Sequence, residues 1–363
     1  MDSSPPADGV IMHQWVKQRN EEESEMNTNV VGLDIAKNIF HFYSLGIDGK
    51  ATKKKLKRAD LLRFFANYKV SLIGIEACGG AHYWARELTK LGHEVVLLNA
   101  RYVKGFVVGN KNDFNDAQAI HEAVLRPNNR VVKIKTEEQQ DMQLLHNIRQ
   151  DLVDKRTALV NQLRGLLMER GIVIPKGINH VRKELPFILE DAENGLTHLS
   201  RELFAEHYDK LKELDKAIKS HEQRIARLCQ QNPRSKRFLE VPGVGIITAS
   251  IIAADIGDGK AYASSRDYAA SLGVVPKQHS SGDKQVYLGV SKRGNRYIRK
   301  MLIHGARSVL KNCYDKTDKL SRWLQALIER RGFNKATVAL ANKNARILWA
   351  MASQDKGYEV RAV

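Results

Sequence analysis

The strongest constraint on the fold is a succession of strand patterns followed by alternating helix and strand patterns. Residues 30–35 and 39–45 are apolar runs rich in β-branched and aromatic residues, and a Gly-Ile-Asp-Gly turn leads to a third run at 51–57. Helical spacing of apolar residues follows at 59–68 and 83–91, with buried strand patterns at 70–75 and 95–98 and more helix from about 101 to 125. The sequence therefore predicts a three-stranded antiparallel meander that continues into α/β alternation.

This order is that of a ribonuclease-H-like fold, although other α/β folds share it. Asp34 ends the first predicted strand and Glu76 ends another, while Asp113 and Asp116 are three residues apart on a predicted helix and so share one face. If the two strands are neighbours, four carboxylates converge at one end of the sheet. Clustered carboxylates repel one another unless a cation neutralises them, and Mg²⁺ prefers such oxygen ligands.

A simpler explanation exists for each acidic residue taken alone. Asp34 and Glu76 could be solvated strand ends, and Asp113 and Asp116 could cap a helix. The set as a whole favours a metal site, in which two metal ions could clamp a phosphodiester.

The net charge of +18, with a pI near 9.7, predicts a polyanionic partner. The basic residues are spread over most of the chain, which favours nucleic acid over a membrane surface. A basic protein without such a partner remains the alternative. No apolar run is long enough for a membrane span. Three widely spaced cysteines fit a reducing cytoplasm and no zinc site.

Two long helical patterns occupy the middle of the chain, at 136–170 and at about 196–229. Leucines recur every seven residues in the first, at Leu145, Leu152, Leu159 and Leu166. The two helices should pair as an antiparallel coiled coil or a dimerising arm. His221 falls in the predicted seam, as a tolerated core residue rather than a metal ligand.

The region from Pro233 onward is predicted to be mostly helical, with loops at 257–260, 273–289 and Gly332. The sequence Pro-Gly-Val-Gly, which includes Gly243 and Gly245, matches a helix-hairpin-helix turn whose backbone N–H groups can approach a phosphate. A tight interhelical turn with glycines for packing explains it equally well.

Two hydroxyl residues, Ser280 and Ser281, precede Gly282 in the predicted loop at 273–289. Hydroxyls ringed by cations suit a nucleophile aimed at a phosphate, although Ser-Ser-Gly is also common turn chemistry. We expect the surrounding cations to contact nucleic acid; they are Lys284, Lys292, Arg293, Arg296, Arg299 and Lys300. By their spacing, Arg296, Arg299 and Lys300 share one helical face. Cys78 is expected to be a small buried residue rather than a catalytic thiol paired with His82.

Several of these motifs, in order, resemble those of the DEDD insertion-sequence transposases, the family that includes the Piv-like DNA invertases and the bridge-RNA-guided recombinases. The resemblance covers nearly the whole chain and rests on the segments Gly32–Lys37, Ile75–Ala77, Asn112–Ala117, Val241–Gly245, Gly273–Pro276, Ser280–Gly282 and Ser291–Asn295. Cys78 and Asn112 depart from the residues frequent in the family, and neither removes a carboxylate.

The resemblance implies magnesium, or manganese in its place, bound by Asp34, Glu76, Asp113 and Asp116. It implies that Ser281, with Ser280 as the alternative, attacks DNA and forms a phosphoserine link. It further implies double-stranded DNA partners at the element ends and the target, a non-coding guide RNA that selects both, and a dimer or tetramer with a composite active site. A bacterial, cytoplasmic and nucleoid-associated protein would fit this function.

The expected organisation comprises a disordered leader (1–28), which lies outside the resemblance, a RuvC-like acidic domain (29–130), a coiled-coil arm for oligomerisation (131–232), a mostly helical transposase domain with the catalytic serine (233–353) and a tail (354–363). Two other functions stay open. One is a RuvC-like junction-resolving nuclease that uses water as the nucleophile, and the other is a non-enzymatic DNA- or RNA-binding protein derived from a transposase. No Walker-type nucleotide-binding loop is present, which fits strand exchange without ATP.

Overall fold

The computed structural model describes residues 29–109, 112–126, 131–281 and 284–359. The predicted leader lies outside the described residues. The chain divides into two compact units. The first combines residues 1–136 with 258–271, and the second combines 137–257 with 272–363. Each unit is described by itself.

The first unit is built on a six-stranded mixed sheet with the strand order β3-β2-β1-β4-β5-β6. β1, β2 and β3 form the antiparallel meander, β4 and β5 run parallel to β1, and β6 is antiparallel to β5. The meander predicted from the sequence is therefore confirmed. The strands are β1 (Asn29–Asp34), β2 (Ile39–Leu45), β3 (Ala51–Lys57), β4 (Ser71–Glu76), β5 (Glu94–Leu98) and β6 (Val131–Val132).

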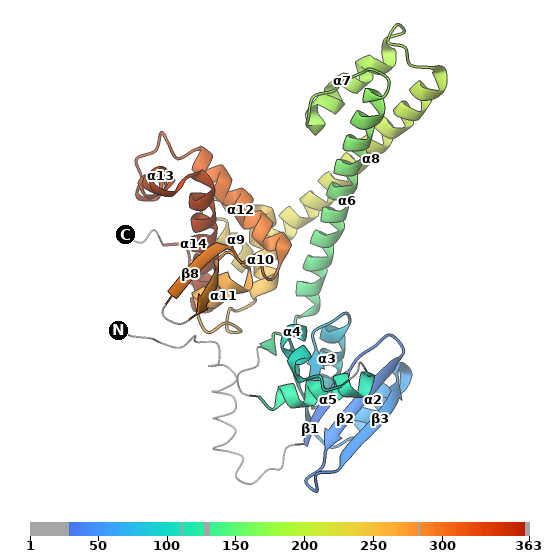
Figure 1. The fold of residues 1–363 in the computed structure, drawn as a ribbon, viewed down its shortest axis with the longest axis vertical. Coiled ribbons are helices and arrows are strands. Elements are labelled where there is room, and N and C mark those ends of the chain that lie inside the picture. The colour runs from blue at the N-terminus through green and yellow to red at the C-terminus, as the bar shows by residue number, and fades with distance from the viewer. Residues whose placement is uncertain (1–28, 110–111, 127–130, 282–283, 360–363) are drawn as a thin grey trace. The chain divides into compact units, whose positions relative to one another are not determined.

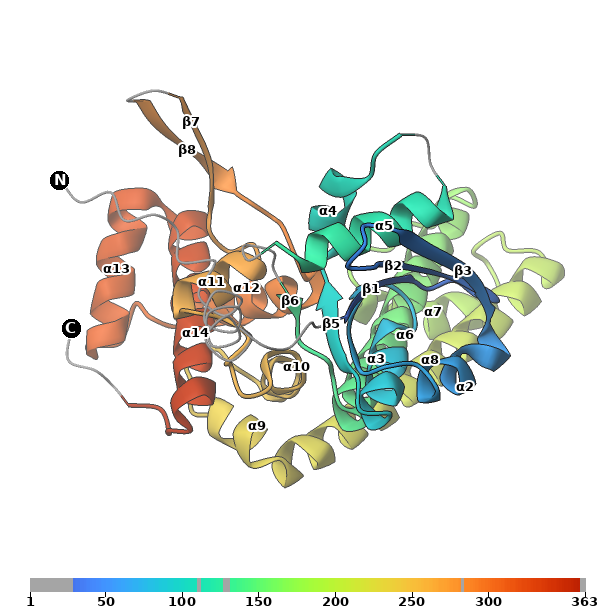
Figure 2. The ribbon, with the colours of Figure 1, turned by 90° about the horizontal axis from the view of Figure 1, so that it is seen from below.

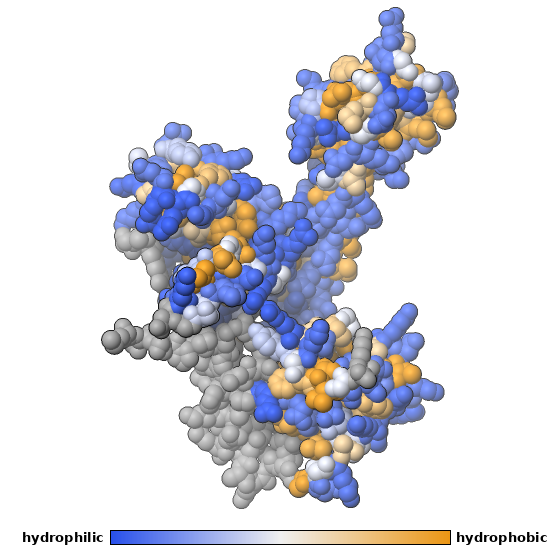
Figure 3. Space-filling model, viewed as in Figure 1, coloured by the Kyte–Doolittle hydropathy of each residue, from blue (hydrophilic) through white to orange (hydrophobic). Residues whose placement is uncertain are grey.

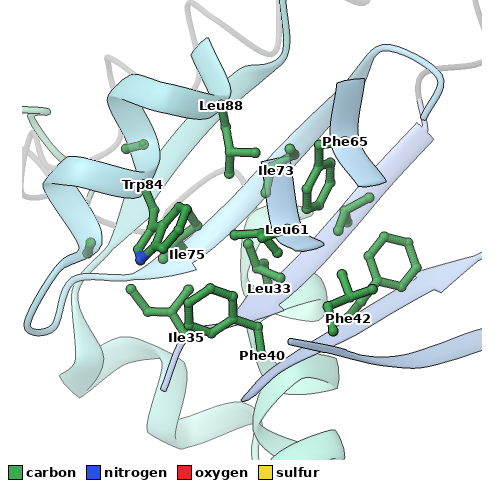
Figure 4. Close-up of a cluster of buried hydrophobic side chains, with 14 of the residues drawn as sticks. Leu33, Ile35, Phe40, Phe42, Leu61, Phe65, Ile73, Ile75, Trp84 and Leu88 are labelled. Carbon is green, nitrogen blue, oxygen red and sulfur yellow. The ribbon is translucent and has the colours of Figure 1, made fainter. Parts of the chain in front are cut away.

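Helices cover both faces of this sheet (Figure 2). On one face, α2 (Leu61–Ala66) and α3 (Ala81–Lys90) bury the main core, in which Phe40 packs edge-on against Trp84 (Figure 4). On the other face lies α5 (Asp113–Val124), which packs on β1, β2 and β4. The odd-numbered residues of β1 point to the first face and the even-numbered residues to α5, because side chains alternate along a strand.

The continuous helix predicted at 101–125 is wrong. The structure has a short helix α4 (Ala100–Val103), a 3-10 turn (Lys104–Phe106), a break and then α5. Gly109 adopts a positive φ of 82°, which does not fit a helix interior. Asn112 then caps α5, since its side chain accepts a hydrogen bond from the N–H of Phe114. The break places Asp113 and Asp116 in the first turn of α5.

The second unit contains two long helices, α6 (Glu137–Met168) and α8 (His198–Gln231), which pack side by side and antiparallel (Figure 1). A shorter helix, α7 (Ile178–Glu190), packs near their far end and was not anticipated from the sequence. Ion pairs join the helices, with Nη–Oε or Nη–Oδ distances of 2.5 Å for Arg149–Glu222, 2.9 Å for Arg156–Asp215 and 2.6 Å for Arg182–Asp215.

The seam of the helix pair differs from the predicted heptad. Leu159 is buried as expected, but Leu166 is 46% exposed, and Leu163 and Leu167 fill the core instead. The reason is that α7 and the loops on either side of it pack on α6 as well as α8 does. They bury a different stripe of α6 from the one that a two-helix heptad would bury. His221 is half-buried and its Nδ1 lies 2.8 Å from the carbonyl of Ala217.

The remaining helices of the second unit form a compact bundle, with α9 (Pro233–Phe238), α10 (Ile246–Ile256), α12 (Arg296–Lys311), α13 (Lys319–Arg331) and α14 (Phe333–Gln354). His146 ties α6 into it, because its imidazole lies 3.0 Å from the hydroxyls of both Ser250 on α10 and Tyr297 on α12. The short helix α11 (Ser265–Ser271) belongs to the first unit. Within the described residues, no helix is both long and apolar enough to cross a bilayer.

Candidate metal centre and serine hairpin

The two acidic strand ends lie next to each other. β1 and β4 are parallel neighbours with Leu33 opposite Ile75, so Asp34 and Glu76 follow at the same end of the sheet. This confirms the adjacency on which the sequence argument depended. Asp34 lies two residues after Gly32, and Glu76 two residues after Gly74. Because side chains alternate along a strand, both carboxylates belong to the face that α5 covers.

Two glycines allow α5 to lie close to the sheet. A Cβ added at Gly32 would come within 2.1 Å of the carbonyl oxygen of Ala117, and one added at Gly74 would come within 2.1 Å of a Val124 methyl group. Each glycine stands two residues before a strand-end carboxylate. The close approach brings the first turn of α5 to Asp34, so both glycines help to form the site.

The carboxylates of Asp34, Asp113 and Asp116 form one cluster. One oxygen from each lies within 4.8 Å of the others, a spacing that suits a shared cation. Asp113 is exposed, with 64% of its side chain accessible, so the cluster opens to solvent. Glu76 lies outside this group of three but is electrostatically coupled to it, because burial and the charge of Asp116 both raise its pKa.

The electrostatics of the cluster favour a bound cation. Burial, followed by the charges of Asp116, Asp113 and Glu76, raises the pKa of Asp34 to about 6. A divalent cation would reverse this penalty and hold all the carboxylates ionised. Hard oxygen donors on two neighbouring strands and one helix turn match the ligand preference of Mg²⁺ or Mn²⁺.

A histidine that the sequence argument missed borders this cluster. His41 on β2 stands opposite Asp34 in the strand pairing, and its Nε2 lies 3.6 Å from a carboxylate oxygen of Asp113. Its ring packs edge-on against Phe114, with the ring centres 4.9 Å apart. The alternation along β2 places His41 on the α5 face, and this signal could have identified it from the sequence.

Cys78 departs from expectation because its side chain is exposed rather than buried. Desolvation of the sulfur and the carboxylates of Glu76 and Asp34 raise its pKa, which disfavours a reactive thiolate. His82 cannot serve as its base, since its Nδ1 accepts the backbone N–H of Lys135 at 3.2 Å.

The predicted loop at 273–289 is instead a β-hairpin, with β7 (Pro276–Ser281) paired to β8 (Lys284–Val290). Nearly all of its residues are exposed on both faces, so the sequence lacks the apolar alternation by which a strand is recognised. Ser280 stands opposite Gln285 and Ser281 opposite Lys284, at the end of the ribbon. Gly282 lies outside the described residues.

The two serines differ in their surroundings. The Ser280 hydroxyl accepts a hydrogen bond from the side-chain amide of Gln278 at 3.0 Å. The Ser281 hydroxyl has no hydrogen-bond partner in the part of the chain that the structure describes. Ser281 is therefore the less constrained of the two hydroxyls.

Arg299 corrects the predicted basic face of α12. It is buried, and its Nη1 donates to the carbonyls of Leu272 at 3.0 Å and Arg293 at 2.7 Å. These two carbonyls flank the hairpin, so Arg299 fixes the hairpin base rather than extending from an exposed face. The cations that remain exposed are Lys284, Lys292, Arg293, Arg296 and Lys300.

The Pro-Gly-Val-Gly turn lies between α9 and α10, the position that the predicted helix-hairpin-helix turn requires. Gly243 serves packing, because its positive φ of 84° and its contact with the backbone of Gly305 on α12 leave no room for a side chain. Gly245 precedes α10 with open space around it. The packing explanation thus holds for Gly243, whereas a side chain at Gly245 would meet no neighbour within 4 Å.

Comparison with known families gives two matches. A DEDD transposase model for IS110 elements matches residues 31–170, which contain all four carboxylates. A model described as the transposase IS116/IS110/IS902 family matches residues 235–321, which contain the hairpin and Arg299.

Individual proteins are similar over almost the whole chain. A transposase for insertion sequence element IS1111A from Coxiella burnetii is 43% identical over 99% of this chain and 99% of its own. A probable family 20 transposase from Pseudomonas aeruginosa is 44% identical over 92% of this chain and 99% of its own. A transposase for element IS1328 from Yersinia enterocolitica is 38% identical, over 90% and 98% respectively.

Proposed function

Because this chain belongs to the IS116/IS110/IS902 family of transposases, we propose that it cuts and rejoins DNA through a covalent phosphoserine intermediate. The observation that carries the proposal is the cluster of Asp34, Asp113 and Asp116, which have carboxylate oxygens within 4.8 Å of one another at one end of the six-stranded mixed sheet. A metal-dependent phosphodiester reaction needs such a cluster, and a purely DNA-binding protein does not.

Asp34, Asp113 and Asp116 hold Mg²⁺, or Mn²⁺ in its place, with Glu76 at the adjacent strand end as the fourth carboxylate of the set. When bound, the metal stabilises the negative charge that develops on the phosphate. The raised pKa of Asp34 supports this assignment, since like charges held together without a cation are costly. His41 stands beside Asp113 and helps to fix the direction of that carboxylate.

The nucleophile in this proposal is the Ser281 hydroxyl. Its Oγ forms a bond to phosphorus, one P–O bond to a sugar breaks, and the serine proton passes to the leaving sugar oxygen. The phosphoserine conserves the bond energy, and the reverse attack by a sugar hydroxyl rejoins the strands. The exposed position of Ser281 beside Lys284 supports this role, and Arg299 supports it indirectly by holding the hairpin base.

The acidic cluster and the serine hairpin belong to different units of the chain. We propose that they meet in a dimer or tetramer, in which one protomer supplies the carboxylates and another supplies the serine. The coiled-coil-like pair of α6 and α8 is the proposed contact. Its far end displays hydrophobic side chains to solvent (Figure 3), among them Val173 at 74% and Phe187 at 67% exposure.

The substrates are double-stranded DNA at the element ends and at the target, chosen by a structured non-coding guide RNA. The net charge of +18 supports the binding of long polyanions. Sequence choice would then rest on base pairing, and the protein would contact the backbone.

The test is DNA cleavage by the purified protein with its guide RNA and element-end DNA, with and without Mg²⁺. Asp113→Asn should abolish cleavage, because it removes a metal ligand, while Asp48→Asn, a matched change in the exposed turn after β2, should not. Cleavage that persists in Asp113→Asn, or that needs no divalent metal, would remove the proposal.

The competing function is a junction-resolving nuclease, since the acidic cluster lies on the first unit and could activate water without the hairpin. In that case Ser281→Ala would still cleave DNA. In the proposed mechanism, Ser281→Ala makes no cut and Ser280→Ala does.

A further inference from the structure

Strand β3, at the edge of the six-stranded sheet, carries a row of lysines, with Lys53, Lys54, Lys55 and Lys57 all exposed. Because side chains alternate along a strand, Lys53, Lys55 and Lys57 share one face and Lys54 points to the other. We call Lys53, Lys55 and Lys57 the lysine row. None of the three forms an ion pair within the described residues.

The strand pairing places the lysine row on the face that holds the carboxylates. Lys55 stands opposite His41, and His41 stands opposite Asp34, so the three residues form one line across the sheet. Lys53 stands opposite Tyr43, whose ring packs against His121 of α5. The row therefore passes the metal-ligand cluster, with Lys55 level with Asp34 and Lys57 and Lys53 on either side.

Side-chain contacts confirm this placement. The ammonium of Lys55 lies 5.8 Å from the ring centre of Phe114, which follows Asp113 on α5. The ammonium of Lys53 lies 5.8 Å from the ring of Tyr43. By contrast, Lys54 lies over Phe64, a residue packed on the opposite, α2 side of the sheet.

We propose that the lysine row binds the phosphate backbone of the DNA strand whose phosphodiester enters the carboxylate cluster. Alternate residues on a strand are about 7 Å apart, and flexible lysine side chains at that spacing can reach successive phosphates. The ammonium groups of Lys53 and Lys55 lie over aromatic rings, while both residues remain exposed to solvent. The proposal rests on the proposed function, because it takes DNA to be the substrate of the acidic site.

Lysines on an edge strand also prevent strand-to-strand aggregation, and that role must be separated from binding. Edge protection needs charge on β3 whichever face it points to, so Lys54 and Lys55 would be equivalent. DNA binding at the site requires the face of the carboxylates, so Lys55 would matter and Lys54 would not. The pair Lys55→Gln and Lys54→Gln thus forms a matched comparison with one charge removed in each.

The first experiment measures binding of the full chain to a DNA duplex by fluorescence anisotropy over a series of KCl concentrations, with Ca²⁺ in place of Mg²⁺. Each lost phosphate contact should make the slope of log K against log salt less negative by about 0.9. Lys55→Gln should show that change and weaker binding, and Lys54→Gln should match the wild type. The triple change of Lys53, Lys55 and Lys57 to Gln should make this slope less negative by about 2 to 3.

The second experiment locates the DNA. A tethered iron–EDTA chelate is attached to Lys55→Cys or Lys54→Cys in a Cys78→Ser background, where Cys229 and Cys313 are buried. Radical cleavage of bound DNA should arise from position 55 and not from position 54. Equal cleavage from both positions, or equal slopes for both glutamine variants, would overturn the proposal.

An RNA of the same length serves as the second probe. If the lysine variants lost affinity for RNA and kept it for DNA, the row would be a guide-RNA surface and the proposal would be wrong. Neither experiment needs strand cleavage. A wild-type protein that binds DNA through the row but never cuts it would refute the proposed function and leave only the DNA-binding role of the lysine row standing.

Discussion

At the scale of single residues, Asp34 is the most strongly perturbed carboxylate of the site. Burial and three neighbouring acids raise its pKa to about 6, so the metal-free site holds a proton below that pH. A metal ion binds the deprotonated carboxylate, and binding must therefore displace this proton.

We expect Mn²⁺ affinity, measured by titration calorimetry, to fall as the pH drops below about 6 and to level off above it. Asp113→Asn should lower the pKa of Asp34, because it removes one of the charges that raise it. A metal affinity that is flat between pH 5 and pH 7 would contradict the assignment of Asp34 as a ligand.

Gly32 is the second residue on which the site depends. Gly32→Ala should lower the free energy of unfolding by about 1 to 3 kcal/mol, because its Cβ would meet the backbone of α5 at 2.1 Å. It should also weaken Mn²⁺ binding, since α5 must move away from Asp34. Gly105→Ala, where nothing lies within 4 Å of the added Cβ, is the control and should change neither quantity.

At the scale of elements, the hairpin depends on its base. Arg299 supplies charged hydrogen bonds to two carbonyls, and Arg299→Met would leave both without this donor. We expect a loss of about 2 to 4 kcal/mol in denaturant unfolding, and faster amide hydrogen exchange in β7 and β8. Arg296→Met, an exposed neighbour on the same helix, should leave exchange unchanged. Equal rates of amide hydrogen exchange in the two variants would show that the Arg299 hydrogen bonds do not order the hairpin.

The strands of the first unit could be predicted because their patterns are local. The positions of Asp34 and Glu76 at strand ends, and their adjacency, follow from apolar runs and from the order of elements. The break before α5 is set by the positive φ of Gly109 and by the side-chain cap of Asn112, two single-residue signals that the apolar spacing of a helix does not reveal.

The hairpin and the role of Arg299 could not be read from the sequence for a different reason. β7 and β8 are exposed on both faces, so no alternation marks them as strands. Arg299 lies among five other cations, and only its contacts with Leu272 and Arg293 reveal that it serves the fold. Residues that act through distant partners are not visible as a local pattern.

At the scale of the whole molecule, the proposed function requires an assembly that brings the carboxylates of one protomer to the serine of another. The hydrophobic end of the arm should be its contact surface, because Val173 and Phe187 are largely exposed there. Val173→Ser combined with Phe187→Ser should shift the protein or its DNA complex toward monomers in mass photometry. Val70→Ser, with a similar exposure of 71% on the first unit, is the control. An unchanged mass distribution would place the contact elsewhere.

In the proposed reaction, carboxylates on one unit and a serine on the other act together on DNA. The most direct measurement is mass spectrometry of the peptide that remains attached to DNA after the reaction is stopped with detergent in the presence of Mg²⁺. We predict a nucleotide joined to Ser281, retained in Ser280→Ala and absent in Ser281→Ala and Asp113→Asn. Cut DNA with no peptide attached, or with the nucleotide on another residue, would contradict the account.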